Sequence, residues 1–345
     1  MRKKELTLIF NFRKFLQIEF SMVTYLILKG NGVRGLRIFY AADLHGGETA
    51  FRKFTNAGKF YNADLVIFGG DFTGKMVVPI VEKGGIYTCT YYGSTVKVKK
   101  AKELPDLERN LRDAGFYPLV ISETDLNKLN ENDAERIIKD KQFEVLKEWI
   151  RLADERFARA GIPCIIIPGS VDDYYLDEVL NSGKHVQNGD GKIIEVNGFE
   201  VLSIGGGKPS VFKYPREISE EELAMKINDL CAQVNDMRKC IFNFHIPPYD
   251  TDLDRGTLYD EDLKPVLDGD SLATAPTGSK AVREAIEKYQ PLLSVHGNVH
   301  ESRGVTKIGK TVCINAGTDY DQGMLRGALI DISSDGALSY TLTAG

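Results

Sequence analysis

Residues 36–45 read LRIFYAADLH, a short apolar run that ends in an Asp-x-His pair. An apolar run of this length, bounded by polar residues, is typical of a buried strand. Side chains along an extended chain alternate between two sides with a period of two, so Asp43 and His45 leave the strand on the same side. The stretch therefore predicts a strand that delivers a carboxylate and an imidazole to one place.

Four more predicted strands end in polar clusters. These clusters are Gly70-Asp71, Gly169-Ser170-Val171-Asp172, Phe244-His245 and His296-Gly297-Asn298-Val299-His300. In open α/β sheets, ligands bind beyond the carboxyl ends of the strands. Imidazole and carboxylate groups suit Zn, Mn and Fe, and an aspartate after the second strand is able to bridge two cations about 3.5–4 Å apart. We therefore expect a metal site at this edge.

The distribution of histidines supports a metal site. Of the five histidines, four lie in these strand-end motifs and only His185 does not. A single histidine at a strand end is more often a structural hydrogen-bonding residue than a ligand. Because four of the five histidines lie at strand ends, a structural role alone does not explain their distribution. His296 is the least suited of the four, because we expect its side chain to point away from the others.

The remaining pattern predicts a layered α/β domain, because strands and helices alternate first and strands dominate later. Predicted helices lie at 49–62, 219–235 and 279–289. Further predicted strands lie at 64–68, 164–167, 193–196, 200–204, 240–244, 292–295, 311–315 and 325–332. We expect one domain over residues 36–332, with an insertion at about 77–160 and a C-terminal strand in 333–345. Within the insertion, residues 77–100 predict a small β-meander, and residues 105–160 are mostly helical.

Bulk composition excludes several classes of protein. The chain of 345 residues has a net charge of −5, so nucleic-acid binding is not indicated. Its five cysteines are scattered and include no Cys-x-x-Cys pair, which favours reduced thiols and a cytoplasmic location. Tyr87, Tyr91 and Tyr92 in the insertion are placed to form a lid or an oligomer contact, so a homo-oligomer is an open expectation.

Residues 1–35 are rich in large apolar side chains, but Arg13, Lys14 and Glu19 interrupt them. No run reaches the about 18–20 apolar residues of a membrane span. The clean apolar middle and small-residue cleavage site of a secretory signal are also missing. We expect an extra packed element here, or a start at Met22 instead of Met1.

Taken in order, the strand-end motifs resemble the signature of calcineurin-like metallophosphoesterases: Asp-x-His, Gly-Asp, Gly-Asn-(His/Asp), His and Gly-His-x-His. Here they stand as Asp43-x-His45, Gly70-Asp71, Gly169-Ser170, His245 and Gly297-Asn298-x-His300. The resemblance covers about residues 36–332. Residues 296–317, HGNVHESRGVTKIGKTVCINAG, are similar to the prokaryotic and archaeal branch whose last motif reads HGHxHE. The resemblance implies a four-layer α/β/β/α sandwich with an inserted β-meander and a helical segment.

The resemblance also implies two metal sites. Asp43, His45, Asp71 and His300 would hold the first metal, and all four are present. The second would be held by Asp71, an asparagine after Gly169, His245 and the first histidine of Gly-His-x-His. This chain has Ser170 for that asparagine and Asn298 for that histidine. Both are poorer ligands for zinc or iron, so we expect a weakened second site.

A third departure concerns proton transfer. The family usually places His or Asp at the position of Val171, as a candidate proton donor to the leaving group, and valine cannot transfer a proton. Asp172 or Asp173 would supply a replacement carboxylate if the loop shifts by one residue. Three explanations stay open: a weakly bound second metal, an enzyme that works with one metal, or a site kept for binding after catalysis was lost.

The sequence thus predicts hydrolysis of a small phosphorylated substrate, a phosphomonoester or a phosphodiester. One or two divalent ions, Mn, Fe or Zn, would activate the attacking water. Asp71 and His245 are the main predicted catalytic residues, with Asp172 as a further candidate. Arg326 would bind a phosphate or, more commonly for such a residue, pair with an acid. The alternative is a non-catalytic or weakly active scaffold on the same fold.

Overall fold

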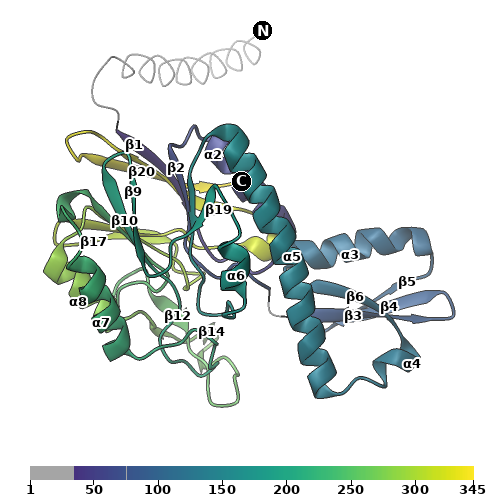
Figure 1. Ribbon diagram of the computed structural model, residues 1–345. Helices are drawn as coiled ribbons and strands as arrows, with labels where there is room; N and C mark the ends of the chain where they lie inside the picture. Colours follow the sequence, from purple (N-terminus) through teal and green to yellow (C-terminus); the bar gives the residue numbers. More distant parts are fainter. Residues whose placement is uncertain (1–34, 75) are drawn as a thin grey trace, which may run out of the picture.

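The computed structural model describes residues 35–74 and 76–345 (Figure 1). Apart from Gly35, the prediction for residues 1–35 lies outside the described residues. Two six-stranded sheets pack face to face, and helices cover their outer faces. The layers therefore run α/β/β/α, as the sequence predicts. Within the described ranges, no helix is long and apolar enough to cross a membrane.

The first sheet has the strand order β20-β19-β1-β2-β7-β8. Its strands are β1 (Leu36–Ala41), β2 (Leu65–Phe68), β7 (Cys164–Ile166), β8 (Val186–Asn188), β19 (Arg326–Ile332) and β20 (Leu338–Ala344). Strands β1, β2, β7 and β8 are parallel, while β19 and β20 are antiparallel to their neighbours. The outer face is covered by α2 (Glu48–Phe60), α5 (Glu131–Ala160) and α6 (Leu176–Leu180). Short strand β8 was missed by sequence analysis.

The second sheet has the order β17-β18-β16-β11-β10-β9. Its strands are β9 (Lys192–Val196), β10 (Phe199–Ile204), β11 (Cys240–Phe244), β16 (Leu293–His296), β17 (Gly304–Ile308) and β18 (Thr311–Asn315). Helices α7 (Glu220–Cys231) and α8 (Lys280–Tyr289) cover its outer face. Both helices begin where the sequence predicts, because Ser219 and Ser279 cap them by accepting backbone N–H bonds.

A buried apolar core fills the space between the two sheets. It includes Ile38, Ile67, Val201, Ile241 and Ile314, each fully buried. Each of the two sheets keeps its central strands parallel, so their carboxyl ends gather at one edge. The polar clusters that follow these strands are thereby brought together.

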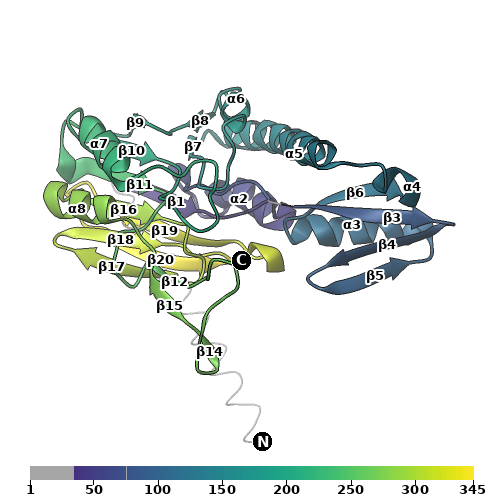
Figure 2. The ribbon, with the colours of Figure 1, turned by 90° about the horizontal axis from the view of Figure 1, so that it is seen from below.

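The insertion forms a sheet of its own with the order β5-β4-β3-β6. It comprises β3 (Val77–Lys83), β4 (Ile86–Tyr91), β5 (Ser94–Val98), η1 (Ala101–Glu103), α3 (Leu104–Asp113), β6 (Tyr117–Ser122) and α4 (Glu123–Leu126). Both views show this sheet extending to one side of the sandwich (Figures 1 and 2). The meander is present as β3, β4 and β5. The largely helical prediction for 105–160 missed β6, which pairs in parallel with β3.

Residues 247–276 contain two short antiparallel strand pairs, one enclosed by the other. Strand β12 (Arg255–Thr257) pairs with β15 (Thr274–Pro276), and β13 (Leu267–Asp268) pairs with β14 (Ser271–Leu272). Single helical turns form η2 (Met237–Lys239) and η3 (Tyr320–Gln322). All five cysteines are buried and free, which agrees with the prediction of reduced thiols.

Candidate metal centre

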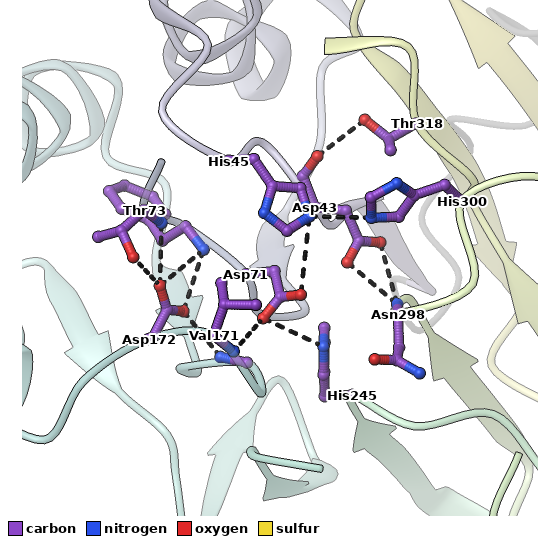
Figure 3. Close-up of polar contacts among 12 residues, drawn as sticks. Asp43, His45, Asp71, Thr73, Val171, Asp172, His245, Asn298, His300 and Thr318 are labelled. Carbon is purple, nitrogen blue, oxygen red and sulfur yellow. Dashed lines mark hydrogen bonds and ion pairs between the residues drawn. The ribbon is translucent and has the colours of Figure 1, made fainter. Parts of the chain in front are cut away.

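The side chains that follow β1, β2, β11 and β16 converge at the edge of the sandwich (Figure 3). Asp43, His45 and His300 form one group of potential metal ligands, and Asp43, Asp71 and His245 form a second. Within each group the ligand atoms all lie within 4.8 Å of one another. Asp43 belongs to both groups, which sequence analysis did not anticipate.

Asp71 belongs to the second group and also approaches His45 of the first group. Its Oδ2 atom is 3.6 Å from His45 Nε2, and its Oδ1 atom is 3.4 Å from His245 Nε2. The His45 Nε2 atom is also 2.8 Å from His300 Nε2. One carboxylate oxygen therefore faces each group, which is the arrangement that a bridging ligand of two cations requires.

Four of the eleven described non-glycine residues with positive φ lie at this centre. Asp43, His45, Asp71 and Asn298 have φ values of 59°, 41°, 56° and 65°, in the left-handed region. A non-glycine residue in this region costs on the order of 1–3 kcal/mol and persists only where its surroundings impose it. Such residues cluster at functional sites, so their convergence here supports a functional role for the centre.

Two motif glycines allow the carboxylates to approach the backbone closely. A Cβ atom on Gly169 would lie 2.1 Å from Asp71 Oδ1, and one on Gly297 would lie 2.6 Å from Asp43 Oδ2. Beside these glycines, the N–H of Val171 donates to Asp71 Oδ1, and the N–H of Asn298 donates to both carboxylate oxygens of Asp43. Main-chain donors thus fix the orientation of both acids.

The two buried carboxylates favour positive charge at the centre. Burial raises the pKa of Asp43 to about 6, although nearby His245 and His300 act in the opposite direction. Burial also acts to raise the pKa of Asp71, but His245 and His45 outweigh it and hold that pKa well below its usual range. Burial alone would lower the pKa of His245, yet the charges of Asp71 and Asp43 raise it to about 9. The negative charges of Asp43 and Asp71, which stabilise protonated His245, would attract a metal cation in the same way.

His245 is oriented as a ligand. Its Nδ1 atom lies 2.7 Å from the Gly69 carbonyl oxygen, which can only accept, so Nδ1 carries the proton. Its Nε2 atom is buried and has no hydrogen-bond partner among the described residues. A buried nitrogen of this kind, facing a carboxylate, fits a divalent metal.

Asn243, Glu301 and Asp319 are not the residues that orient His245. Asn243 bonds to Ser203, Glu301 accepts from Thr257, and Asp319 pairs with Arg326. The Gly69 carbonyl oxygen orients the His245 ring by accepting a hydrogen bond from its Nδ1. Arg326 is therefore held in an ion pair, which is the commoner of its two predicted roles.

Asp172 does not face the ligands (Figure 3). Its fully buried carboxylate accepts from the N–H groups of Phe72, Thr73 and Gly169 and from the Thr73 hydroxyl. Burial and the charge of Asp71 raise its pKa. The predicted catalytic or replacement-ligand role of Asp172 does not match this placement, because these four donors occupy its oxygens. It ties together the loops that carry Asp71 and Ser170.

The remaining predicted residues lie around the centre. Ser170 is buried, and a Cβ on Gly207 would lie 2.7 Å from its Cβ. Asn298 contributes its backbone N–H to Asp43. His296 is fully buried, its Nδ1 lies 3.0 Å from the carbonyl oxygens of Phe244 and Ile246, and burial lowers its pKa to about 4. His296 is thus structural, as its predicted orientation suggested.

Sequence analysis missed two residues beside the centre. The ring centroid of Tyr320 lies 5.1 Å from that of His45 and 6.3 Å from that of His300. The Thr318 hydroxyl donates to the Asp43 carbonyl. Both follow β18, a predicted strand that ends at the same edge. An inspection of the residues that follow this strand, as was done for the other strands, would have found them.

Comparison with known proteins supports the fold. No family model matches this chain. The uncharacterized protein MJ1162 of Methanocaldococcus jannaschii is 29% identical over 177 residues, or 51% of this chain and 70% of that protein. One solved crystal structure aligns with a TM-score of 0.55 and 14% identity, over 89% of this chain and 99% of its own.

Two further solved structures resemble the chain more weakly. TT1561 of Thermus thermophilus aligns with a TM-score of 0.47 and 14% identity, over 89% of this chain and 99% of its own. An archaeal phosphodiesterase aligns with a TM-score of 0.29 and 12% identity, over 89% of this chain and 100% of its own. The similarity to the first of these structures is one of fold, the layered α/β sandwich described above.

Proposed function

We propose that this protein hydrolyses a phosphomonoester or phosphodiester with the help of one or two divalent metal ions. The observation that carries the proposal is the position of Asp71, whose two carboxylate oxygens face His45 and His245. Two overlapping groups of acids and imidazoles that share a carboxylate are typical of two-metal hydrolases. Mn, Fe and Zn suit this mixture of nitrogen and oxygen ligands.

Asp43, His45, Asp71 and His300 would hold the first metal, and Asp71, His245 and Asp43 would hold the second. When bound, such a metal supplies Lewis acidity, which polarises phosphoryl oxygens and lowers the pKa of water toward about 7. Ser170 and Asn298 replace stronger ligands at the second position. Asp43 also belongs to the second group, and its carboxylate offsets part of the loss in metal affinity.

The protein's own residues limit which phosphate esters are good substrates. Val171 presents its backbone N–H to Asp71 and offers no side-chain proton to a leaving group. Asp172 is engaged by four donors and lies behind Asp71. Neither Val171 nor Asp172 therefore serves as a general acid. Esters with good leaving groups, such as aryl phosphates or phosphoanhydrides, would then react faster than simple alkyl phosphates.

A second candidate function is a non-catalytic or weakly active scaffold on the same fold. The substitutions at Ser170, Val171 and Asn298 favour it, because all three affect one side of the centre. Metal content and activity separate the two candidates. Bound metal with turnover of p-nitrophenyl phosphate or bis(p-nitrophenyl) phosphate supports the hydrolase, and bound metal without turnover of either supports the scaffold.

A further inference from the structure

A strip of aromatic side chains leads from the metal centre onto the insertion. We define the aromatic strip as Tyr320, Tyr92, Phe116 and Tyr91. At one end, the Tyr320 ring packs 5.1 Å from the ring of His45, a predicted metal ligand. At the other end, the Phe116 ring lies 5.1 Å from the ring of Tyr92 and 6.0 Å from the ring of Tyr91.

The backbone directly before Phe116 packs against Tyr320. Gly115, directly before Phe116, is buried so tightly that a Cβ there would lie 2.8 Å from the Tyr320 ring and 2.4 Å from the His45 carbonyl oxygen. In Figure 2, η3, which carries Tyr320, lies beside the end of α3 that leads into this glycine. The insertion is therefore anchored beside the metal centre at Gly115, directly before Phe116.

Tyr92 is an unusual residue for its position. It occupies the two-residue turn between β4 and β5, because Tyr91 pairs with Ser94 across the hairpin. Its φ is 47° and that of Gly93 is 71°. Such a turn favours Asn-Gly, since a bulky residue is strained at positive φ. Tyr92 is also 65% exposed. Turn geometry does not favour a tyrosine here, and the side chain packs on Phe116 and Tyr91 while most of it stays exposed.

We propose that the aromatic strip binds the planar base of a nucleotide whose phosphate ester lies at the metal centre. This inference rests on the proposed function and names its substrate class. Aromatic side chains bind bases of any sequence by stacking on their faces, and tyrosine hydroxyls add hydrogen-bonding capacity at the edge. An alkyl phosphate has no group that the strip would recognise.

The test compares two substrates that release the same leaving group. These are thymidine 5′-monophosphate p-nitrophenyl ester, which carries a base, and methyl p-nitrophenyl phosphate, which does not. Tyr92→Asn removes the ring and suits the turn, so it keeps the fold. We expect the ratio of kcat/KM for the two substrates to fall roughly 5- to 150-fold, the equivalent of about 1–3 kcal/mol of stacking. Tyr92→Phe should keep most of the ratio.

Tyr340→Ala removes another exposed tyrosine, on β20, and should leave the ratio unchanged. Calorimetric binding of thymidine 5′-monophosphate and methyl phosphate to the metal-loaded protein provides a readout that does not need turnover. If no ester is hydrolysed but Tyr92→Asn still weakens nucleotide binding selectively, the proposed function fails and the base site stands. An unchanged ratio in both measurements overturns the base site. So does a change of oligomeric mass in Tyr92→Asn with unchanged selectivity, which would make the strip a contact between copies.

Discussion

The Nε2 atoms of His45 and His300 lie 2.8 Å apart, although 255 positions separate the two residues in the chain. Two imidazole nitrogens at this distance share a single proton or face a common partner. The carboxylate of Asp71 lies 3.6 Å from the same His45 nitrogen. The pair therefore joins loops that follow strands of the two sheets of the sandwich.

Replacing His300 tests this pair as part of a metal site. We expect His300→Ala to lose bound metal, because the first group would keep only Asp43 and His45 with Asp71 nearby. In the wild type, saturating metal at about 100 times its Kd should stabilise the fold by roughly 2.7 kcal/mol. Elemental analysis and melting curves with and without Mn or Zn measure both effects.

His185→Ala is the matched control, since His185 is exposed and lies outside the centre. It should keep the full metal content and the full thermal shift. Equal metal content in His300→Ala and His185→Ala would contradict the assignment of His300.

Restoring the usual ligands should strengthen the second site. We expect Asn298→His combined with Ser170→Asn to raise metal content and activity on an aryl phosphate. The change at Asn298 should contribute more, because Ser170 is buried with its Cβ close to Gly207, and a longer side chain must displace that loop. Each single variant serves as a control for the pair. No gain in metal or in activity would refute the description of a weakened site.

The rate of hydrolysis should depend strongly on the leaving group of the ester. With Val171 at the position of the proton donor, we expect turnover of p-nitrophenyl phosphate to exceed that of an alkyl phosphate by far more than in an enzyme with a general acid. General acid catalysis contributes about 10²–10⁴-fold. Val171→His should raise alkyl phosphate hydrolysis and leave aryl phosphate hydrolysis nearly constant. Equal wild-type rates on the two esters would contradict the absence of a general acid.

Asp172 should matter for stability. An amide at this position cannot accept from all four donors, so Asp172→Asn leaves buried N–H or O–H groups without a partner. Each such group costs roughly 1–3 kcal/mol. We expect a loss of stability of about this size in urea unfolding, with metal content reduced as the Asp71 loop loosens. Asp173→Asn, at the partly exposed next position, should change neither quantity.

The layered fold follows largely from local patterns in the sequence. Apolar runs such as 240–244 and 311–315 match the observed strands, because a strand buried on both faces leaves an uninterrupted apolar signal. Strand β6 gives no such signal. It contains Pro118 and faces solvent in part, and only pairing with β3 makes it a strand.

The candidate site was predicted in composition but not in its details. The strand-end motifs identified Asp43, His45, Asp71, His245 and His300, since parallel strands must end at one edge. Which carboxylate serves both groups depends on loop geometry that no spacing encodes. The same holds for Asp172, whose partners lie about 100 positions earlier in the chain.

The four left-handed residues at the centre have a consequence for directed evolution. Each would be relaxed by replacement with glycine, which adopts positive φ without penalty. Selection for heat resistance alone, with no demand for activity, should therefore accumulate glycine at Asp43, His45, Asp71 or Asn298. Deep sequencing of such a population would reveal the centre as the place where stability and chemistry compete.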